Sequence, residues 1–322
     1  MMVMALLHNM YTAADVNHQL RYPITTMHHH FRILFIISQY IIIIIECVAL
    51  QPARIMNEAV VDIGVNLTHR AFRKHWRNVV QRAIDAGVTK MILTGTSIQG
   101  SEDCLGLCQT WFEETGEKNL FATVGIHPHD AKTWNDGQSY AQMKEMLSHP
   151  LAVAVGECGL DFNRNFSTPE DQVHAFREQV KLAVELNMPL FLHEREAHEE
   201  LVNVLDEVEA ELLPPIVVHC FTGTNKEAIE YIQRGYYIGF TGTICKKERG
   251  APLREMLPSI PLDRIMVETD APFMGFKRGR KSSEPADCID VARKLAETID
   301  MTFSTVCDTT TTNAVEFFRM KE

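Results

Sequence analysis

The sequence predicts a single (β/α)8 barrel of the TIM type over residues 56–322. Two observations lead to this prediction. From residue 57 onward, short apolar runs alternate with segments of helical spacing, and the alternation occurs eight times. The repeats occupy about 265 residues, which is the usual size of a barrel of this class. A doubly wound parallel sheet, which also alternates strands with helices, is the main alternative.

Eight segments have the character of buried parallel strands. Each is short, apolar and rich in β-branched residues, and a turn follows it. The expected strands are Val60–Asn66, Lys90–Gly95, Leu120–His127, Ala152–Asp161, Met188–Glu194, Pro215–Phe221, Gly235–Gly242 and Ile265–Pro272.

The segments between these strands carry the signals of amphipathic helices. Apolar residues between 72 and 84 form one helical stripe, which Gly87 terminates. Thr168 is expected to cap the helix after the fourth strand. Thr224 and Glu227 are spaced as a capping box for the helix after the sixth strand. Local sequence therefore agrees with the alternating pattern.

Composition and charge restrict the classes of function. The chain has 322 residues, of which 46% are hydrophobic and 23% charged, so a disordered, collagenous or multi-span membrane protein is excluded. Its 31 Lys and Arg against 42 Asp and Glu give a net charge of −11. This excludes a uniformly basic nucleic-acid-binding surface but allows a local basic patch. The eight Cys contain no C-x-x-C pair, which predicts reduced, mostly buried thiols.

Residues 1–55 form an N-terminal extension outside the eightfold pattern. They contain an apolar run, Ile33–Ile45, that is shorter than the roughly 20 residues a spanning helix needs. Three interpretations remain open. The run belongs to a signal peptide over Met27–Ala49, which would make the protein secreted; or the chain truly starts near Met56, which would leave it cytoplasmic or nuclear; or the segment is a membrane-proximal anchor.

Ionisable residues occur at the carboxyl ends of the expected strands, where barrels of this class have their active sites. His127, Glu157, His193, His219 and Asp270 end or nearly end five different strands. Because side chains alternate between the two faces of a strand, two imidazoles and at least two carboxylates are expected to converge inside the barrel. Such burial is unfavourable unless a divalent cation neutralises the charges, and this donor set suits zinc, manganese and similar metals. The sequence therefore predicts a metal site.

The same alternation assigns faces to neighbouring residues. Glu268 shares the inward face of the eighth strand with Asp270. Cys158 and Cys220 are expected to point outward and to pack against helices. We therefore expect neither thiol to bind the metal.

Basic residues gather after the last two strands and are expected to surround the mouth of the barrel. They are Lys277, Arg278, Arg280 and Lys281 after the eighth strand and Lys246, Lys247 and Arg249 after the seventh. An acidic body with a basic rim favours the binding of an anionic strand.

Five motifs, in order along the chain, resemble the signatures of the TatD family of metal-dependent deoxyribonucleases in the amidohydrolase superfamily. The motifs are Val61–Thr68, Gly125–His129, Gly156–Phe166, His219–Thr224 and Glu268–Pro272, and the resemblance covers about residues 57–320. It implies a metallo-dependent hydrolase that cleaves DNA phosphodiester bonds. It further implies 3′–5′ exonuclease action on single-stranded DNA or 3′ ends. The implied cofactor is a divalent cation, usually Mg²⁺, with Mn²⁺ or Zn²⁺ as alternatives, and no protein partner is implied.

The resemblance also implies roles for individual residues. The metal ligands would be Glu157, His193, His219 and Asp270, and the catalytic residues would be Asp270, Glu157 and His127, with His127 beside the scissile phosphate. Arg195 and Arg164 would face the substrate, together with the basic residues Lys277, Arg278 and Arg280.

The chain departs from the family pattern in two places. Many members begin with Asp-x-His-x-His, whereas here Asp62 is followed by Gly64 and Asn66, so two metal ligands are missing. One branch of the family shares this substitution, and we expect it to leave one tight metal and at most a weak second one. An Arg-Asn-Glu-Pro element after the eighth strand is here Ser282–Pro285, which lacks the arginine and the asparagine.

Two other functions remain compatible with the residues. A barrel of this type could hydrolyse esters, lactones or aminoacyl-tRNA, since the fold hosts many reactions. A non-catalytic relative could instead bind nucleic acid without cleaving it.

Overall fold

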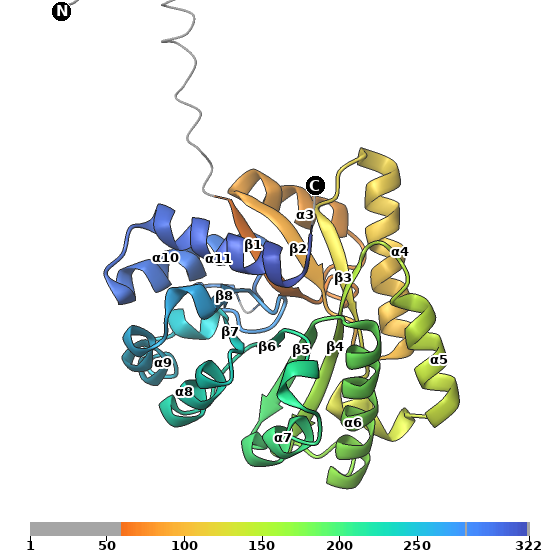
Figure 1. Cartoon of the computed structure of the whole chain (residues 1–322). Coiled ribbons are helices and arrows are strands. Elements are labelled where there is room, and N and C mark those ends of the chain that lie inside the picture. The colour runs from red at the N-terminus through yellow and green to blue at the C-terminus, as the bar shows by residue number, and fades with distance from the viewer. Residues whose placement is uncertain (1–58, 281, 321–322) are drawn as a thin grey trace, which may run out of the picture. The chain divides into compact units, whose positions relative to one another are not determined.

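The computed structural model of the protein describes residues 59–280 and 282–320 (Figure 1). The predictions about the N-terminal extension 1–55, its signal-like segment and a start at Met56 lie outside the described residues and remain predictions. Lys281 also lies outside them.

Eight parallel strands form one sheet in sequential order. They are β1 (Val60–Val65), β2 (Val88–Leu93), β3 (Leu120–Val124), β4 (Ala152–Asp161), β5 (Leu190–Arg195), β6 (Ile216–Val218), β7 (Tyr237–Phe240) and β8 (Ile265–Val267). A parallel bridge between Val65 and Ala271 joins the two ends of the sheet, which makes a nearly closed barrel (Figure 1). The predicted (β/α)8 barrel is confirmed.

Helices connect the strands and lie on the outer face of the barrel (Figure 1). They are α3 (Trp76–Ala86), α4 (Ile98–Thr115), α5 (Asp136–Met146), α6 (Pro169–Leu186), α7 (His198–Leu205), α8 (Asn225–Gln233), α9 (Ala251–Met256), α10 (Cys288–Ile299) and α11 (Phe303–Phe317). Within the described residues, none of them combines the length and the apolar character that crossing a bilayer would require.

The helix ends follow the predicted local signals. Gly87 terminates α3 with a left-handed backbone (φ 105°). The Thr168 side chain accepts a hydrogen bond from the backbone N–H of Asp171 at the start of α6. Thr224 and Glu227 form the expected capping box at the start of α8. These local predictions are confirmed.

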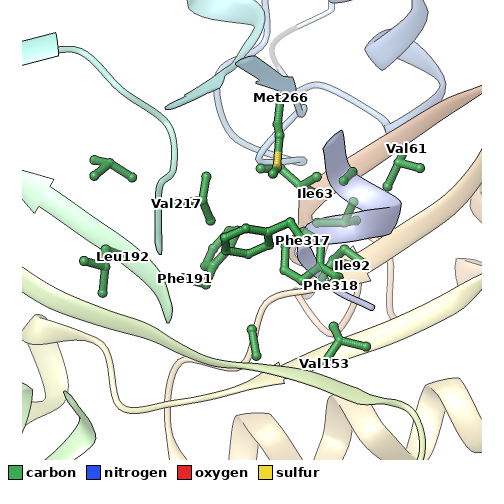
Figure 2. Packing of buried hydrophobic residues seen from close by; sticks show 14 of the residues in the cluster. Val61, Ile63, Ile92, Val153, Phe191, Leu192, Val217, Met266, Phe317 and Phe318 are labelled. Carbon is green, nitrogen blue, oxygen red and sulfur yellow. The ribbon is translucent and has the colours of Figure 1, made fainter. Parts of the chain in front are cut away.

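The interior of the barrel is filled by apolar side chains below the ionisable residues. Figure 2 shows Phe191 packed among side chains from several strands, with Phe318, just after α11, close by. The Phe191 ring also lies 4.5 Å, centroid to centroid, from the ring of His219. At Gly156, a Cβ would lie 2.2 Å from the carbonyl oxygen of Phe191, so only glycine permits this approach of β4 to β5. The apolar core thus forms the floor on which the polar residues rest.

Six of the eight strands end one to five residues earlier than the sequence predicted, and β3 stops at Val124, three residues before its predicted end. β6 and β8 stop at Val218 and Val267, three and five residues before the predicted ends. The physical reason is local: Cys220 and Asp270 adopt positive φ angles of 46° and 51°, which turn the backbone out of the ladder. His219 and Asp270 therefore lie on the first loop residues and not within the strands.

Candidate metal centre and active site

Three imidazoles converge on a single carboxylate oxygen of Glu157. The distances to Glu157 Oε1 are 2.8 Å from His219 Nε2, 2.9 Å from His193 Nδ1 and 3.2 Å from His127 Nε2. These residues come from the carboxyl ends of β3, β4, β5 and β6 or from the residues just after them. The structure therefore brings together four of the five residues that the sequence placed at this end of the barrel.

Asp270 borders this cluster from the β8 side. Its Oδ1 accepts a hydrogen bond of 2.8 Å from the side-chain amide of Asn66, and its Oδ2 lies 4.0 Å from Cys220 Sγ. Asn66 is thus a donor that orients Asp270. The prediction that Cys220 points outward is wrong, because its positive φ turns the residue into the cavity beside Asp270. Cys158 is fully buried.

Glu268 holds His219 from behind, a role that our sequence reasoning missed. Its Oε2 lies 3.2 Å from His219 Nδ1, and its Oε1 accepts the backbone N–H of Cys220. A carboxylate on the far nitrogen of a ligating histidine fixes the ring and its tautomer. The strand alternation already placed Glu268 on the inward face, so the signal was present in the sequence.

Asp161 is a second supporting carboxylate that the sequence reasoning missed. Its Oδ2 accepts a hydrogen bond of 2.8 Å from His129 Nε2 and lies 3.4 Å from His193 Nε2. Its Oδ1 accepts backbone N–H groups of Asn163 and Arg164, which fixes the loop after β4. The side chain is almost completely buried, and these donors hold its pKa below the usual range against the opposing effect of burial.

Asp62 has a structural role. This carboxylate is completely buried and accepts hydrogen bonds from the Thr269 backbone N–H (2.8 Å) and hydroxyl (2.6 Å). It therefore ties β1 to the turn that carries Asp270. Burial raises its pKa well above the usual value.

The cluster separates the charge states of its members. Burial would raise the pKa of Glu157, but the neighbouring imidazoles, His127 and His219 foremost, hold it well below the usual value. Burial would lower the pKa of His219, but the carboxylates of Glu157 and Glu268 raise it well above normal. Burial raises the pKa of Asp270 to about 7, although His219 opposes this effect. Glu157 is therefore ionised, and Asp270 can exchange a proton near neutral pH.

The residues fit a divalent cation. One ligand atom each from His127, Glu157 and His193 lie within 4.8 Å of one another. His193 Nε2 is buried, makes no hydrogen bond of good geometry and lies 3.4 Å from Asp161 Oδ2, so this imidazole nitrogen lacks a close partner. Neutral imidazole and carboxylate form a common donor set for zinc and other divalent metals. A divalent cation bound by these residues would explain why ionisable groups can be buried together here.

A cavity of about 940 Å³ opens beside the cluster over the carboxyl ends of β5–β8. His193 and His219 contribute to its wall, as do Arg195 and Arg249. The cavity gives a substrate access to the cluster. Its wall carries these two guanidinium groups together with four carboxylates, those of Glu194, Glu196, Glu227 and Glu255.

The sequence pattern of one protein family, TatD related DNase, matches residues 61–319. The chain belongs to the TatD family. It is 42% identical over 240 residues to the 3′-5′ ssDNA/RNA exonuclease TatD of Escherichia coli (strain K12), covering 73% of this chain and 89% of that one. The corresponding protein of Cronobacter sakazakii is 47% identical over 213 residues, or 66% and 78% of the two chains.

Solved structures agree with this assignment. The TatD homolog YJJV from Escherichia coli K12 is 28% identical, covers 81% of this chain and 98% of its own, and superposes with a TM-score of 0.71. A TatD family hydrolase from Entamoeba histolytica, at 23% identity and a TM-score of 0.72 over 80% and 97% of the chains, shares the fold. The predicted family membership is confirmed, and with the His/Glu/His cluster it indicates use of a divalent metal.

Three of the arginines expected to face the substrate lie in different parts of the site. Arg195 lines the cavity, and Arg164 lies on the loop that Asp161 fixes. Arg278 is exposed on the loop after β8. Their substrate-binding roles remain predictions.

Lys277 and Arg280 are engaged in ion pairs within the protein. Lys277 Nζ lies 2.8 Å from Asp287 Oδ1 and 2.6 Å from Asp290 Oδ2. Arg280 pairs with Asp287 and lies 3.8 Å from Glu284. These contacts fasten the loop to the start of α10. The two cations are therefore less available to phosphate than the sequence run suggested.

Proposed function

We propose that this chain is a 3′–5′ exonuclease that hydrolyses the phosphodiester bonds of single-stranded DNA with the help of Mg²⁺. The observation that carries the proposal is the convergence of three imidazoles on Glu157 beside an open cavity. Membership of the TatD family, whose relatives in Escherichia coli and Cronobacter sakazakii are named as 3′-5′ ssDNA/RNA exonucleases, supports it.

Glu157, His193 and His219 would hold the cation, with Asp270 at the edge of the site. When bound, the cation would polarise the phosphoryl group and lower the pKa of its water. Mg²⁺ keeps several waters and takes few protein ligands, which agrees with a site whose remaining neighbours lie toward the open cavity.

Asp270 would accept the proton of the attacking water. Burial raises its pKa to about 7, which matches a general base near neutral pH. The hydrogen bond from Asn66 keeps Oδ1 engaged, whereas Oδ2 lies 4.0 Å from the thiol of Cys220, a residue that lines the cavity.

His127 would donate a hydrogen bond to a phosphate oxygen. Its Nδ1 accepts the backbone N–H of His129 (3.0 Å), which assigns the ring proton to Nε2 in the neutral form. Burial lowers the pKa of His127 below the usual value, so the ring is neutral at pH 7. The Nε2–H then faces Glu157 at 3.2 Å, within the cluster where the phosphate would bind.

Cleavage of end-labelled oligonucleotides tests the proposal. The full chain is incubated with single-stranded DNA, duplex DNA and single-stranded RNA, in Mg²⁺, Mn²⁺ or EDTA. We expect stepwise shortening of 5′-labelled single-stranded DNA in Mg²⁺ and none in EDTA. Internal cutting, turnover that survives EDTA, or hydrolysis of carboxylic esters alone would contradict it.

A further inference from the structure

We propose that Phe166 and Phe273 are stacking platforms for nucleobases on either side of the scissile phosphate. This inference rests on the proposed function, because it names how that site would recognise a single strand. The starting observation is exposure: the two side chains are 59% and 47% exposed, more than any other Phe among the described residues. Phe166 is the last residue of the motif that carries Glu157, and Phe273 directly follows the motif that carries Asp270.

Phe166 lies at the end of a series of ring contacts that starts in the cluster. Its ring centroid is 4.7 Å from that of His129, and the His129 centroid is 4.2 Å from that of His127. The planes of Phe166 and His129 meet at 89°, and an edge-to-face contact leaves at least one face of Phe166 uncovered. Phe166 is thus two ring contacts from His127, and a base on its open face would be three contacts from that ring.

The backbone around Phe166 is fixed, so its exposure is a property of an ordered loop. Lys132 Nζ donates to the Phe166 carbonyl (3.1 Å), and the Ser167 hydroxyl donates to the His129 carbonyl (2.9 Å). The Lys132 backbone N–H in turn donates to Ser167 Oγ (3.1 Å). A rigid, pre-placed ring loses little freedom when it binds a base. The ammonium of Lys132 adds a cation for the adjoining phosphate.

Phe273 lies at the other end of the cluster, three residues after Asp270. Its backbone N–H donates to the Asp270 carbonyl (2.9 Å), and its carbonyl accepts the Ser283 hydroxyl. Its ring meets that of His69 at 69°, with centroids 5.4 Å apart. Phe273 is thus held on the β8–β1 side of the mouth, whereas Phe166 lies on the β3–β4 side.

Two exposed, fixed aromatic rings at the ends of a cation site match the requirements of a single strand. Stacking on an aromatic ring is tolerant of sequence because every base has a π-face. In a duplex the base faces are already stacked on their neighbours. The two rings therefore favour unpaired DNA over duplex DNA without reading sequence.

The test is binding and turnover of a fluorescein-labelled oligo-dT strand by the full-length variants Phe166→Ala, Phe273→Ala and Phe166→Tyr. Phe112→Ala is the matched control, because Phe112 is 37% exposed on α4 and lines a different cavity near the amino end of β4. Binding is measured in EDTA by anisotropy, so that it does not depend on cleavage. We expect each Ala variant to raise Kd and KM about tenfold with little change in kcat. Phe166→Tyr and Phe112→Ala should resemble the wild type.

Oligonucleotides with single abasic sites identify the stacked bases. At the position that stacks on Phe166, removal of the base should raise the Kd of the wild type but should not raise the Kd of Phe166→Ala further. Unchanged Kd and KM in both Ala variants, or equal loss in Phe112→Ala, would overturn the inference. If the wild type binds the strand through these rings but does not cleave it, the proposed function fails and the stacking inference stands. If the protein cleaves the strand but KM does not change when either ring is removed, the proposed function stands and the stacking inference fails.

Discussion

The carboxylate of Glu268 fills the space beside Gly64. A Cβ at residue 64 would lie 2.3 Å from Glu268 Oε2, the oxygen that faces His219 Nδ1. The first strand therefore has no room for a side chain at residue 64, the position where the resemblance to the family's Asp-x-His-x-His pattern would imply a histidine. The absence of a side chain at residue 64 therefore makes room for the Glu268 carboxylate that orients His219.

Gly64→Ala should destabilise the protein and weaken its metal site. The new methyl would displace a carboxylate that the His219 ring and the Cys220 N–H hold in place, at about 1–3 kcal/mol. Thermal unfolding and metal titration measure the two effects. The control is Gly106→Ala in α4, where a Cβ meets nothing within 4 Å and should be neutral or slightly stabilising. Equal behaviour of the two variants would refute the packing argument.

Glu268→Ala should lower metal affinity roughly 10–100-fold, because His219 loses the carboxylate that orients it. Glu268→Gln keeps an acceptor and should lose less. Isothermal titration with Mn²⁺ measures the affinities. Glu255→Gln, a change in α9 on the wall of the same cavity, serves as control. If all three variants bind Mn²⁺ like the wild type, Glu268 does not support the site.

Metal binding should release a proton and tighten as pH rises. The pKa of His219 is raised well above its usual value by Glu157 and Glu268, so the metal-free ring carries a proton at pH 7. A cation at Nε2 must displace that proton. Calorimetric titrations at pH 7 in buffers with different ionisation enthalpies count the protons released. Affinity that is flat between pH 6 and pH 8, with no proton released, would contradict this charge state.

Lys277 and Arg278 should respond differently to substitution. Lys277→Ala leaves the buried carboxylate of Asp287 with one partner fewer and should lower the free energy of unfolding by about 1 kcal/mol, a modest value because Lys277 is half-exposed. Arg278→Ala should leave the free energy of unfolding unchanged and raise KM. It should also reduce the slope of log binding constant against log salt concentration by about one, the value expected for one lost phosphate contact. Urea denaturation and KM at several salt concentrations separate the two. A KM effect confined to Lys277 would reverse the assignment.

The barrel was predictable because its signals are local and repeated. Apolar runs and the caps at Thr168 and Thr224 depend on neighbours in sequence, and the structure agrees with them. The convergence on Glu157 was predictable from the alternation of side chains and the closure of the sheet. The strand ends were less predictable. β8 stops at Val267, and the residues after it leave the sheet because Asp270 adopts a positive φ and Thr269 donates to Asp62 on β1.

Contacts between distant segments explain the other differences. The run from Lys277 to Arg280 looked like a free basic patch, but its acidic partners, Asp287 and Asp290, come from the start of the next helix. The roles of Asp161 and Glu268 depend on which nitrogen of a histidine faces which carboxylate. Sequence spacing fixes the face of a residue but not such a pairing.

The central claim is that Glu157 holds one tightly bound divalent cation on which cleavage depends. Metal content after dialysis against metal-free buffer, measured together with 3′-exonuclease activity in Glu157→Ala, tests it most directly. Glu145→Ala, a change at an exposed residue of α5, is the control. We predict about one equivalent of metal in the wild type and the control, from the tight-ligand argument, and neither metal nor activity in Glu157→Ala. Full activity in Glu157→Ala, or an unchanged metal content in that variant, would contradict the account.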